Sequence, residues 1–463
     1  MRRSAAVLAG VLLIAGVASR DVGTVDSVTS ASTPTFSKDV APILLKHCAT
    51  CHRPGQIAPM SLLSYAEVRP WAKAVRNNVA NRVMPPWYAD PSASLKFRND
   101  RRLSPEEIDT IVAWVDGGSP KGDDSDLPPA PQFTDTWAYG PPDHVIEMPV
   151  EFDIPAEGEL PVLRFYSKLP FEEDRYLEKV EMKPSNVAVV HHANVHFQSL
   201  KIPEGARFVD GGFVGPDGQE ITPEGLRGGS SVFDVDQGQL ISYVPGRGYE
   251  AYPPGVGKVL PAGQWLVWSV HYTATGKPEK DRVRIGLYFS KEPVRHVVVT
   301  SQISGTLIVE GKELVNDKET GRVEVPPIPP YAENWWIRAI MPVQEDITLH
   351  GFQPHAHLRS QEWKYVVTYP DGKEEVLLTV PNYSFEWQLH YELAEPKKIP
   401  AGSRLMAFGR YDNSLKNRYN PGPDKKVYWS EQSWDEMFQP KIEYSIDRLE
   451  RKVETPTTRQ REQ

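Results

Sequence analysis

The sequence predicts a multidomain protein, in which a small all-α domain is followed by two all-β antiparallel sandwiches. The length of 463 residues exceeds what one hydrophobic core normally serves. Apolar residues recur at helical spacing in residues 36–118, whereas from residue 145 onward they alternate with polar residues as in half-buried strands. Because the alternating region is much longer than one sandwich of about 100 residues, we expect two sandwiches.

The chain begins with the pattern of a secretory signal, assigned to residues 1–19. Two arginines precede an apolar run from Ala5 to Val17 and then small residues. An uncleaved membrane anchor is the alternative, but the run is shorter than the roughly 20 residues that a spanning helix needs. We therefore expect a periplasmic or otherwise exported protein with no stable membrane span after signal removal.

The composition limits the classes of partner and scaffold. The net charge is −9, from 52 Lys and Arg against 61 Asp and Glu, and no basic run has interleaved aromatic residues. Nucleic acid is therefore not an expected partner. The chain has two cysteines, Cys48 and Cys51. An exported protein with so few thiols cannot be a multi-disulfide scaffold and must be stabilised by packed cores.

Both cysteines belong to one motif in the helical domain predicted at residues 36–118. Cys48, Cys51 and the adjacent His52 form C-x-x-C-H, the attachment signature of a c-type haem. The two thiols would bind the vinyl groups covalently, and His52 would be the proximal iron ligand. A structural disulfide and half of a zinc site are the alternatives, but His52 and the exported context favour one haem c.

Met84 is the expected sixth ligand of the haem iron. It lies in Met84-Pro85-Pro86, a loop stiffened by prolines, and a thioether ligand raises the potential of an electron-transfer haem. Met60 is an alternative ligand, and Met84 could instead have only a packing role.

Two capping boxes predict helices around the haem motif. Ser64 precedes Glu67, and Ser104 precedes Glu107 with proline at the first helical position. The second helix would close the small haem domain. Residues 119–144, rich in Pro, Gly and Asp, are typical of a linker.

The β-rich region divides into sandwiches predicted at residues 145–292 and 293–446. The boundary follows the alternating strand that ends at Phe289. Residues 369–372, Tyr-Pro-Asp-Gly, predict a hairpin turn between two further alternating segments. The charged tail, residues 447–463, is expected to be disordered.

Histidines in both sandwiches have patterns that suit metal binding. In a strand, His355 and His357 lie on the same face, so both imidazoles can reach one ion near a strand end. His191 and His192 are adjacent, and they can share a metal only if their strand is bulged or sharply twisted. His271 shares the expected inward face of its strand with Trp265 and Val267, so a metal ligand and a hydrogen-bonded core histidine are both open.

Met437 is the next soft donor after the His355 and His357 pair. Two imidazoles with one thioether suit a copper ion that must exist as Cu(I), whereas three imidazoles accept both copper oxidation states. Because the chain has no cysteine outside the haem motif, blue-copper and thiolate-bridged sites are excluded.

Residues 145–445 resemble the copper type II, ascorbate-dependent monooxygenase family, which includes peptidylglycine α-hydroxylating and dopamine β-monooxygenases. The resemblance depends on four short motifs in a fixed order. These are His191-His192, His271-Tyr272, His355-Ala356-His357 and Asp435-Glu436-Met437.

The resemblance implies two copper ions in two jelly-roll sandwiches, kept apart across a solvent-filled cleft. His191, His192 and His271 would bind an electron-storing copper. The copper that meets O2 and a small substrate, whose activated C–H bond is hydroxylated, would bind to His355, His357 and Met437. Three other histidines match no ligand position and are expected to be structural or to lie next to ligands: His196, His350 and His390.

The chain departs from the family in two respects. The animal enzymes are rich in disulfides, whereas this region has no cysteine. Gln353 stands where the amidating enzyme has an arginine for the substrate carboxylate, so peptide amidation is not expected.

The N-terminal region resembles exported bacterial class I cytochrome c domains, and the fusion suggests that the haem supplies the electrons of monooxygenation. The reductant would be ascorbate or an external redox protein. The alternative is a non-enzymatic periplasmic electron-transfer or copper-binding protein, in which the sandwiches are a scaffold.

Overall fold

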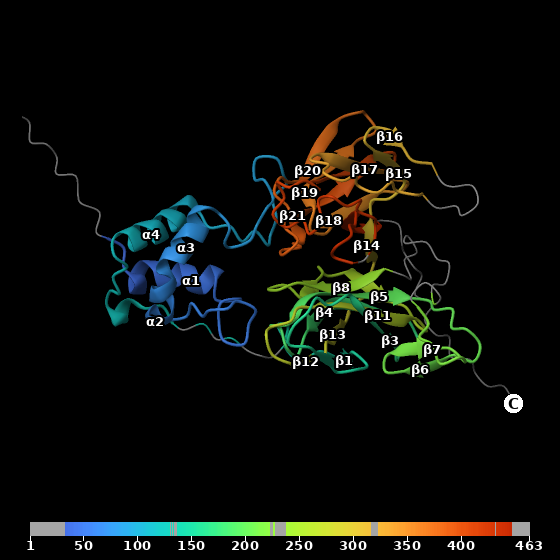
Figure 1. Ribbon diagram of the computed structural model, residues 1–463, viewed down its shortest axis with the longest axis horizontal. Helices are drawn as coiled ribbons and strands as arrows, with labels where there is room; N and C mark the ends of the chain where they lie inside the picture. Colours follow the sequence, from blue (N-terminus) through green and yellow to red (C-terminus); the bar gives the residue numbers. More distant parts are fainter. Residues whose placement is uncertain are drawn as a thin grey trace, which may run out of the picture. The chain divides into compact units, whose positions relative to one another are not determined.

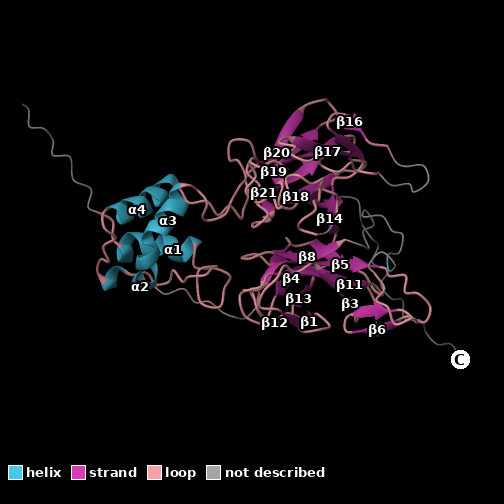
Figure 2. Cartoon of the chain, viewed as in Figure 1, coloured by secondary structure: helices cyan, strands magenta, loops and turns pink. Residues whose placement is uncertain are grey.

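The computed structural model describes residues 33–446, except 130, 132, 134–136, 223–225, 227–237, 316–322 and 431 (Figure 1). The predicted signal sequence at 1–19 and the predicted tail at 447–463 lie outside the described residues. Helices are confined to the N-terminal part of the described chain, and strands make up most of the remainder (Figure 2). No helix in the described part is long and apolar enough to cross a membrane.

The helical region has its own hydrophobic core, which includes Leu44, Val68, Ile111 and Trp114. Ser104 and Glu107 form the complete capping box that the sequence predicts. The helices are a π-helix at Phe36–Val40, α1 (Ala41–His47), α2 (Tyr65–Val68), a 3-10 turn at Arg69–Trp71, α3 (Ala72–Ala80), α4 (Pro105–Asp116) and a 3-10 turn at Asp124–Asp126.

The first sandwich packs its core between two sheets, around residues such as Leu177, Val195, Trp268 and Leu287. One sheet has the order β1-β13-β4-β10, with β9 also paired to β4, and the other has the order β3-β11-β5-β8. Short pairs β2–β12 and β6–β7 lie outside them. The strands are β1 (His144–Glu147), β2 (Phe152–Ile154), β3 (Leu163–Lys168), β4 (Arg175–Lys183), β5 (Val190–Gln198), β6 (Arg207–Val209), β7 (Gly212–Val214), β8 (Gln239–Tyr243), β9 (Tyr249–Ala251), β10 (Val256–Leu260), β11 (Trp265–Tyr272), β12 (Glu279–Asp281) and β13 (Arg284–Phe289).

The second sandwich has a separate core that includes Phe352, Trp363, Leu405 and Tyr411. Its sheets have the orders β14-β23-β18-β21 and β16-β15-β17-β22-β19-β20. Pairing of β19 with β20 confirms the predicted hairpin. The strands are β14 (His296–Gln302), β15 (Thr306–Val309), β16 (Lys312–Glu313), β17 (Trp335–Pro342), β18 (Ile347–His355), β19 (Ser360–Thr368), β20 (Glu374–Val380), β21 (Tyr391–Ile399), β22 (Arg404–Tyr411) and β23 (Gln439–Ile446).

One sheet continues from the first sandwich into the second. Strand β10 pairs with β14 in parallel through Val256 with His296 and Gly257 with Val297, whereas the other pairs of named strands in the described part are antiparallel. The predicted boundary between residues 292 and 293 falls between β13 and β14. Parallel neighbours need a long connection rather than a hairpin, and β11 to β13 provide it.

A segment that the sequence places in the helical domain packs on the second sandwich. Trp87, Ala89 and Phe97 are buried in the core of that sandwich, and Phe97 forms a β-bridge with Leu393. The chain between α3 and α4 therefore connects the helical region to the second sandwich by packing as well as by sequence.

Candidate metal centre

Three histidines of the first sandwich meet at the ends of two paired strands. His271 on β11 pairs with His192 on β5, but the next residue, Tyr272, pairs with Val190. His191 is therefore the extra residue of a β-bulge. This is the irregularity that the sequence requires if adjacent histidines are to face the same side.

The three imidazoles converge on one point. One ligand atom from each of His191, His192 and His271 lies within 4.8 Å of the other two, so the three residues could hold a metal ion. The Nδ1 atoms of His191 and His192 are 3.1 Å apart. The Nδ1 atom of His271 is buried and has no hydrogen-bond partner among the described residues. A buried polar atom without a partner is costly, and a shared cation would satisfy all three rings.

The prediction that His271 shares an inward face with Trp265 and Val267 is wrong for the main core. That core takes the opposite face of β11, including Trp268 and Tyr272. Trp265 and Val267 instead contact a small satellite cluster. Because side chains alternate along a strand, His271 lies on the face away from the main core and can meet groups outside its own sandwich.

The second sandwich presents two imidazoles whose rings are already oriented. His355 is the last residue of β18, His357 follows it, and the ring centroids are 5.4 Å apart. His355 Nδ1 lies 2.5 Å from Gln388 Oε1, and His357 Nδ1 lies 3.2 Å from the carbonyl oxygen of Asp435. Because both oxygens are acceptors, the two Nδ1 atoms donate, and the Nε2 atoms are left to bind a metal.

A buried carboxylate joins the backbone of Met437 to that of His357. Glu436 is fully buried, and its Oε2 accepts the backbone N–H of His357 at 2.8 Å and that of Met437 at 3.2 Å. Its Oε1 accepts the N–H of Arg359. The structure therefore brings the segment with the predicted thioether beside the segment with the predicted imidazoles.

The two groups of histidines adjoin each other. The ring centroids of His192 and His355 are 6.0 Å apart, and the Phe385 ring lies 5.0 Å from that of His191 and 5.7 Å from that of His357. The solvent-filled cleft that the family resemblance implies between the groups is therefore wrong for this structure. The physical reason is that the two sandwiches share a sheet and a buried polar interface.

Burial keeps all five imidazoles in the form that binds metals. It lowers the pKa of His191 and His357 to about 4, and it lowers the pKa of His271 as well. The pKa values of His192 and His355 are well below the usual value for the same reason, with a further contribution from neighbouring imidazoles. Neutral rings at neutral pH have lone pairs available for a cation.

A cavity of about 500 Å³ adjoins the first group of histidines. His191 and His271 line it together with Tyr383, Phe385 and Asn417. A small molecule in this cavity would lie beside the imidazoles, in a space with both aromatic and polar walls.

The residues of the haem motif have surroundings that suit the group. Cys48 and Cys51 are not joined in a disulfide, and His52 Nδ1 lies 3.2 Å from the carbonyl oxygen of Met60. Such a bond fixes the tautomer of a proximal ligand and leaves Nε2 for the iron. It also places the backbone of Met60 on the side of His52.

Met84 lines a cavity of about 1550 Å³. The apolar side chains of Val79, Leu103 and Ile108 contribute to its wall, as does His47, which directly precedes Cys48. Charged side chains such as Lys46 and Arg82 also line it, and Cys48, Cys51 and His52 do not, so the choice of Met84 over Met60 as sixth ligand stays a prediction.

The remaining predicted positions lie outside the cluster. His350 Nε2 contacts Ser445 Oγ at 2.9 Å, and His390 lies among the carboxylates of Glu392 and Glu443. Sequence reasoning missed Gln388, because a single glutamine in a loop carries no motif. The role of Glu436 has one sequence signal, its position directly before Met437.

The comparisons with known proteins leave the family unassigned. No protein-family model matches the chain, and no curated protein matches it. Similar solved structures include PNGF-II, at 9% identity and a TM-score of 0.23, where the match covers 65% of this chain and 64% of that one. They also include the CBM22 tandem domain of Paenibacillus barcinonensis Xyn10C, at 8% identity, a TM-score of 0.16 and coverage of 64% and 86%. Paenibacillus xanthan lyase matches at 10% identity, a TM-score of 0.15 and coverage of 71% and 27%. Likenesses this weak carry no argument about function.

Proposed function

We propose that this chain is an exported, copper-dependent monooxygenase that hydroxylates a C–H bond of a small substrate with O2 and receives electrons through a covalently attached haem. The observation that carries the proposal is the pair of ligand groups. Three imidazoles converge in the first sandwich, and two oriented imidazoles lie beside a methionine segment in the second.

The chemistry of the donor set favours copper. His191, His192 and His271 would hold one ion, and His355, His357 and Met437 the other. Three imidazoles would also suit zinc, but a thioether is a soft ligand that favours Cu(I). Bound copper would supply the one-electron redox chemistry that the use of O2 requires.

The protein's own contribution is to orient the ligands and to receive the substrate. Gln388 and the Asp435 carbonyl hold the second pair of rings with Nε2 free. The cavity beside His191 and His271 has space for a small molecule, and the Phe385 ring contacts imidazoles of both groups. These features would hold a substrate close to both metal positions.

The contact between the haem motif and the first sandwich supports the proposed source of electrons. A Cβ atom at Gly246 would lie 3.1 Å from Cys51 Sγ, so the sulfur packs closely against this turn. Arg101 Nη2 donates to the Gly246 carbonyl at 2.9 Å. The turn follows β8, in which Tyr243 pairs with Ala193, the residue after His192. A short path of packed and paired backbone thus joins the attachment site to the first group of histidines.

The test measures how fast the reduced haem is reoxidised by O2 and whether this rate depends on copper. The purified full-length chain is loaded with copper and reduced with ascorbate, and haem absorbance is followed by stopped flow after mixing with O2. We expect rapid reoxidation of the haem that depends on copper, together with labelled oxygen from isotopic O2 in the product of a C–H substrate from a small-molecule panel. The His192→Ala variant, whose haem motif is intact, is the matched control and should reoxidise slowly.

Each failure has a separate meaning. A haem that reoxidises at the same rate with and without copper would exclude the proposed electron supply. Tight copper binding with no incorporation of labelled oxygen from any substrate would favour the non-enzymatic electron-transfer or copper-binding alternative.

A further inference from the structure

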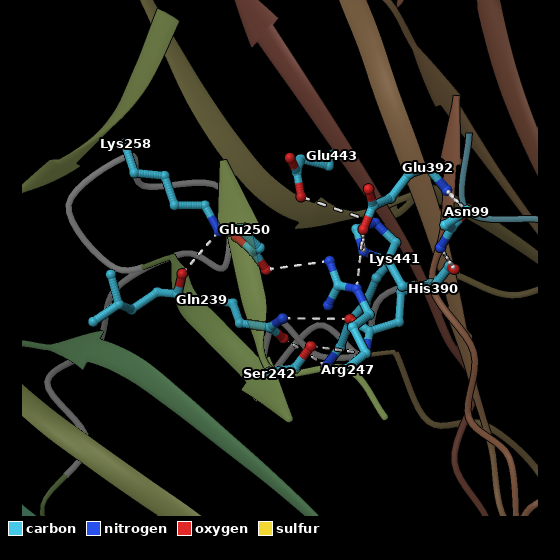
Figure 3. A network of polar contacts seen from close by, with 12 residues as sticks. Asn99, Gln239, Ser242, Arg247, Glu250, Lys258, His390, Glu392, Lys441 and Glu443 are labelled. Carbon is cyan, nitrogen blue, oxygen red and sulfur yellow. Dashed lines mark hydrogen bonds and ion pairs between the residues drawn. The ribbon is translucent and has the colours of Figure 1, made fainter. Parts of the chain in front are cut away.

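A group of mostly buried charged side chains lies between the two sandwiches (Figure 3). We call it the interface ion cluster. It has three cations and three carboxylates, and His390 lies among them. The six charged members are Arg247, Lys258, Lys441, Glu250, Glu392 and Glu443; the ion pairs join Arg247 and Lys258 to carboxylates, whereas Lys441 donates to Gln239.

The first crossing between the sandwiches runs through Arg247. This residue lies in the turn after β8 of the first sandwich, and its Nε donates to Glu392 Oε1 on β21 of the second at 3.1 Å. Its other partner is Glu250 at 3.6 Å, and Glu250 in turn accepts from Lys258 at 2.7 Å. The Arg247 side chain is 6% exposed and that of Glu392 is 16% exposed, so the ion pair across the interface is largely shielded from water.

The second crossing is a chain of hydrogen bonds that joins β8 to β23 and β18. Lys441 Nζ on β23 donates to Gln239 Oε1 on β8 at 2.9 Å. Gln239 Nε2 donates to Gln353 Oε1 at 3.3 Å, and Gln353 Nε2 donates to Ser242 Oγ at 3.2 Å. Gln353 is two residues before His355 on β18.

The same crossing reaches β5, the strand that carries His191 and His192. Ser242 pairs with Asn194, which is two residues after His192 on β5. The chain of hydrogen bonds therefore links β18 to β5. On β18 it ends two residues from His355, and on β5 it ends two residues from His192.

Physical chemistry indicates what such a cluster does. Buried ion pairs add little net stability, because the cost of removing charges from water offsets their attraction. A shift of one sandwich along the other would leave a buried charge without its partner, which is strongly unfavourable. The cluster therefore selects one register of the interface, and the shared sheet at β10 and β14 limits opening.

We propose that the interface ion cluster fixes the two sandwiches in the register in which all five imidazoles form a single two-copper site, so that the two ions bind as neighbours. The proposal rests on the proposed copper binding and adds to it that the ions interact. His192 and His355 belong to different groups, yet their ring centroids are only 6.0 Å apart, and the proposal explains this proximity.

The first test is paramagnetic resonance of the oxidised full-length chain, after elemental analysis has shown two copper ions per chain. Neighbouring Cu(II) ions interact, so we expect a signal well below two spins per chain, or one split by coupling, with a half-field transition. Two isolated Cu(II) signals at full intensity would overturn this inference and leave the monooxygenase proposal intact. A chain that binds no copper would overturn both.

The second test asks whether the cluster sets the register. Arg247→Met and Lys441→Met each remove one cation of a crossing without touching a proposed ligand. We expect the spin interaction to weaken in both variants while the copper content is unchanged. Lys280→Gln, which breaks an exposed ion pair with Asp153, is the matched control and should keep the wild-type spectrum.

A metal-free measurement covers the case in which a variant folds poorly. Hydrogen exchange of β8 and β18 in the wild-type chain without copper should show strong protection. Rapid exchange of both strands would mean that the interface is not fixed before metal binding, and would overturn the role assigned to the cluster.

Discussion

The two groups of histidines are held in different ways. In the first group the rings contact one another, the Nδ1 atoms of His191 and His192 face each other at 3.1 Å, and Nδ1 of His271 has no hydrogen-bond partner among the described residues. In the second group each Nδ1 has an oxygen acceptor, from Gln388 or from the Asp435 carbonyl. The first group thus offers Nδ1 atoms to an ion, and the second offers Nε2 atoms.

This difference indicates how each half of the site is built. The second group is oriented by the protein before any metal binds, since its outer hydrogen bonds fix both tautomers. The first group depends on the bulge at His191, and Nδ1 of His271 has no hydrogen-bond partner among the described residues before a cation binds. We therefore expect metal to order the first group more than the second.

The largest expected effect comes from removing one ring of the first group. His192→Ala should lower the copper content from two ions to one per chain and reduce turnover by more than about 100-fold. The reason is that two remaining imidazoles cannot replace a three-ligand site. Elemental analysis with a turnover assay measures both. Retention of two tightly bound copper ions by this variant would contradict the assignment of the first group.

A smaller effect is expected from loosening an outer hydrogen bond of the second group. Gln388→Ala should weaken copper binding there by about 10- to 100-fold and leave the first group unchanged. Competitive titration with a Cu(I) chelator measures the two affinities. Gln219→Ala, at an exposed glutamine, is the control. The comparison requires the two groups to be held separately. Equal weakening of copper binding at both sites in Gln388→Ala would contradict it.

The smallest effect concerns the interface that joins the groups. Burial, together with nearby Glu250, raises the pKa of Glu443 to about 7, although Lys258 and Arg247 oppose the shift. A carboxyl group with a raised folded-state pKa binds its proton more tightly when folded, so its contribution to stability is lost as the pH rises through that value. Glu443 by itself should lower the free energy of unfolding by up to about 3 kcal/mol between about pH 5 and pH 8, whereas the imidazoles with lowered pKa values, such as those of His191 and His357, raise it over the acidic part of this range.

Relative to the wild-type chain, Glu443→Gln should gain stability as the pH rises from about 5 to 8, because the amide does not titrate. The contributions of Glu436, whose pKa burial also raises to about 7, and of the buried histidines are common to both chains, so they cancel in the difference between variant and wild type. Chemical denaturation of the metal-free chain at several pH values gives the slope of the free energy of unfolding against pH. An unchanged slope in the variant would exclude Glu443 as a contributor.

Local patterns predicted the local structure. The capping box at Ser104 and the hairpin at residues 369–372 are present, and the condition placed on His191 and His192, a bulged strand, is met. In each case neighbouring residues determine the geometry, so the sequence window contains the required information.

The arrangement between distant segments could not be predicted in the same way. The approach of His192 to His355, the parallel pairing of β10 with β14, and the packing of Trp87 on the second sandwich all depend on contacts between residues far apart in the chain. The interface ion cluster also has no sequence signature. Its charged residues come from several strands and one turn. In the sequence alone, nothing distinguishes them from charged residues on the protein surface.

The most direct test of the central claim is a crystal structure of the copper-loaded chain with anomalous diffraction measured on both sides of the copper edge. We expect two anomalous peaks, one among His191, His192 and His271, and the other in contact with His355, His357 and the sulfur of Met437. Absence of copper from both positions, or a Met437 sulfur far from the His355 and His357 rings, would contradict the account.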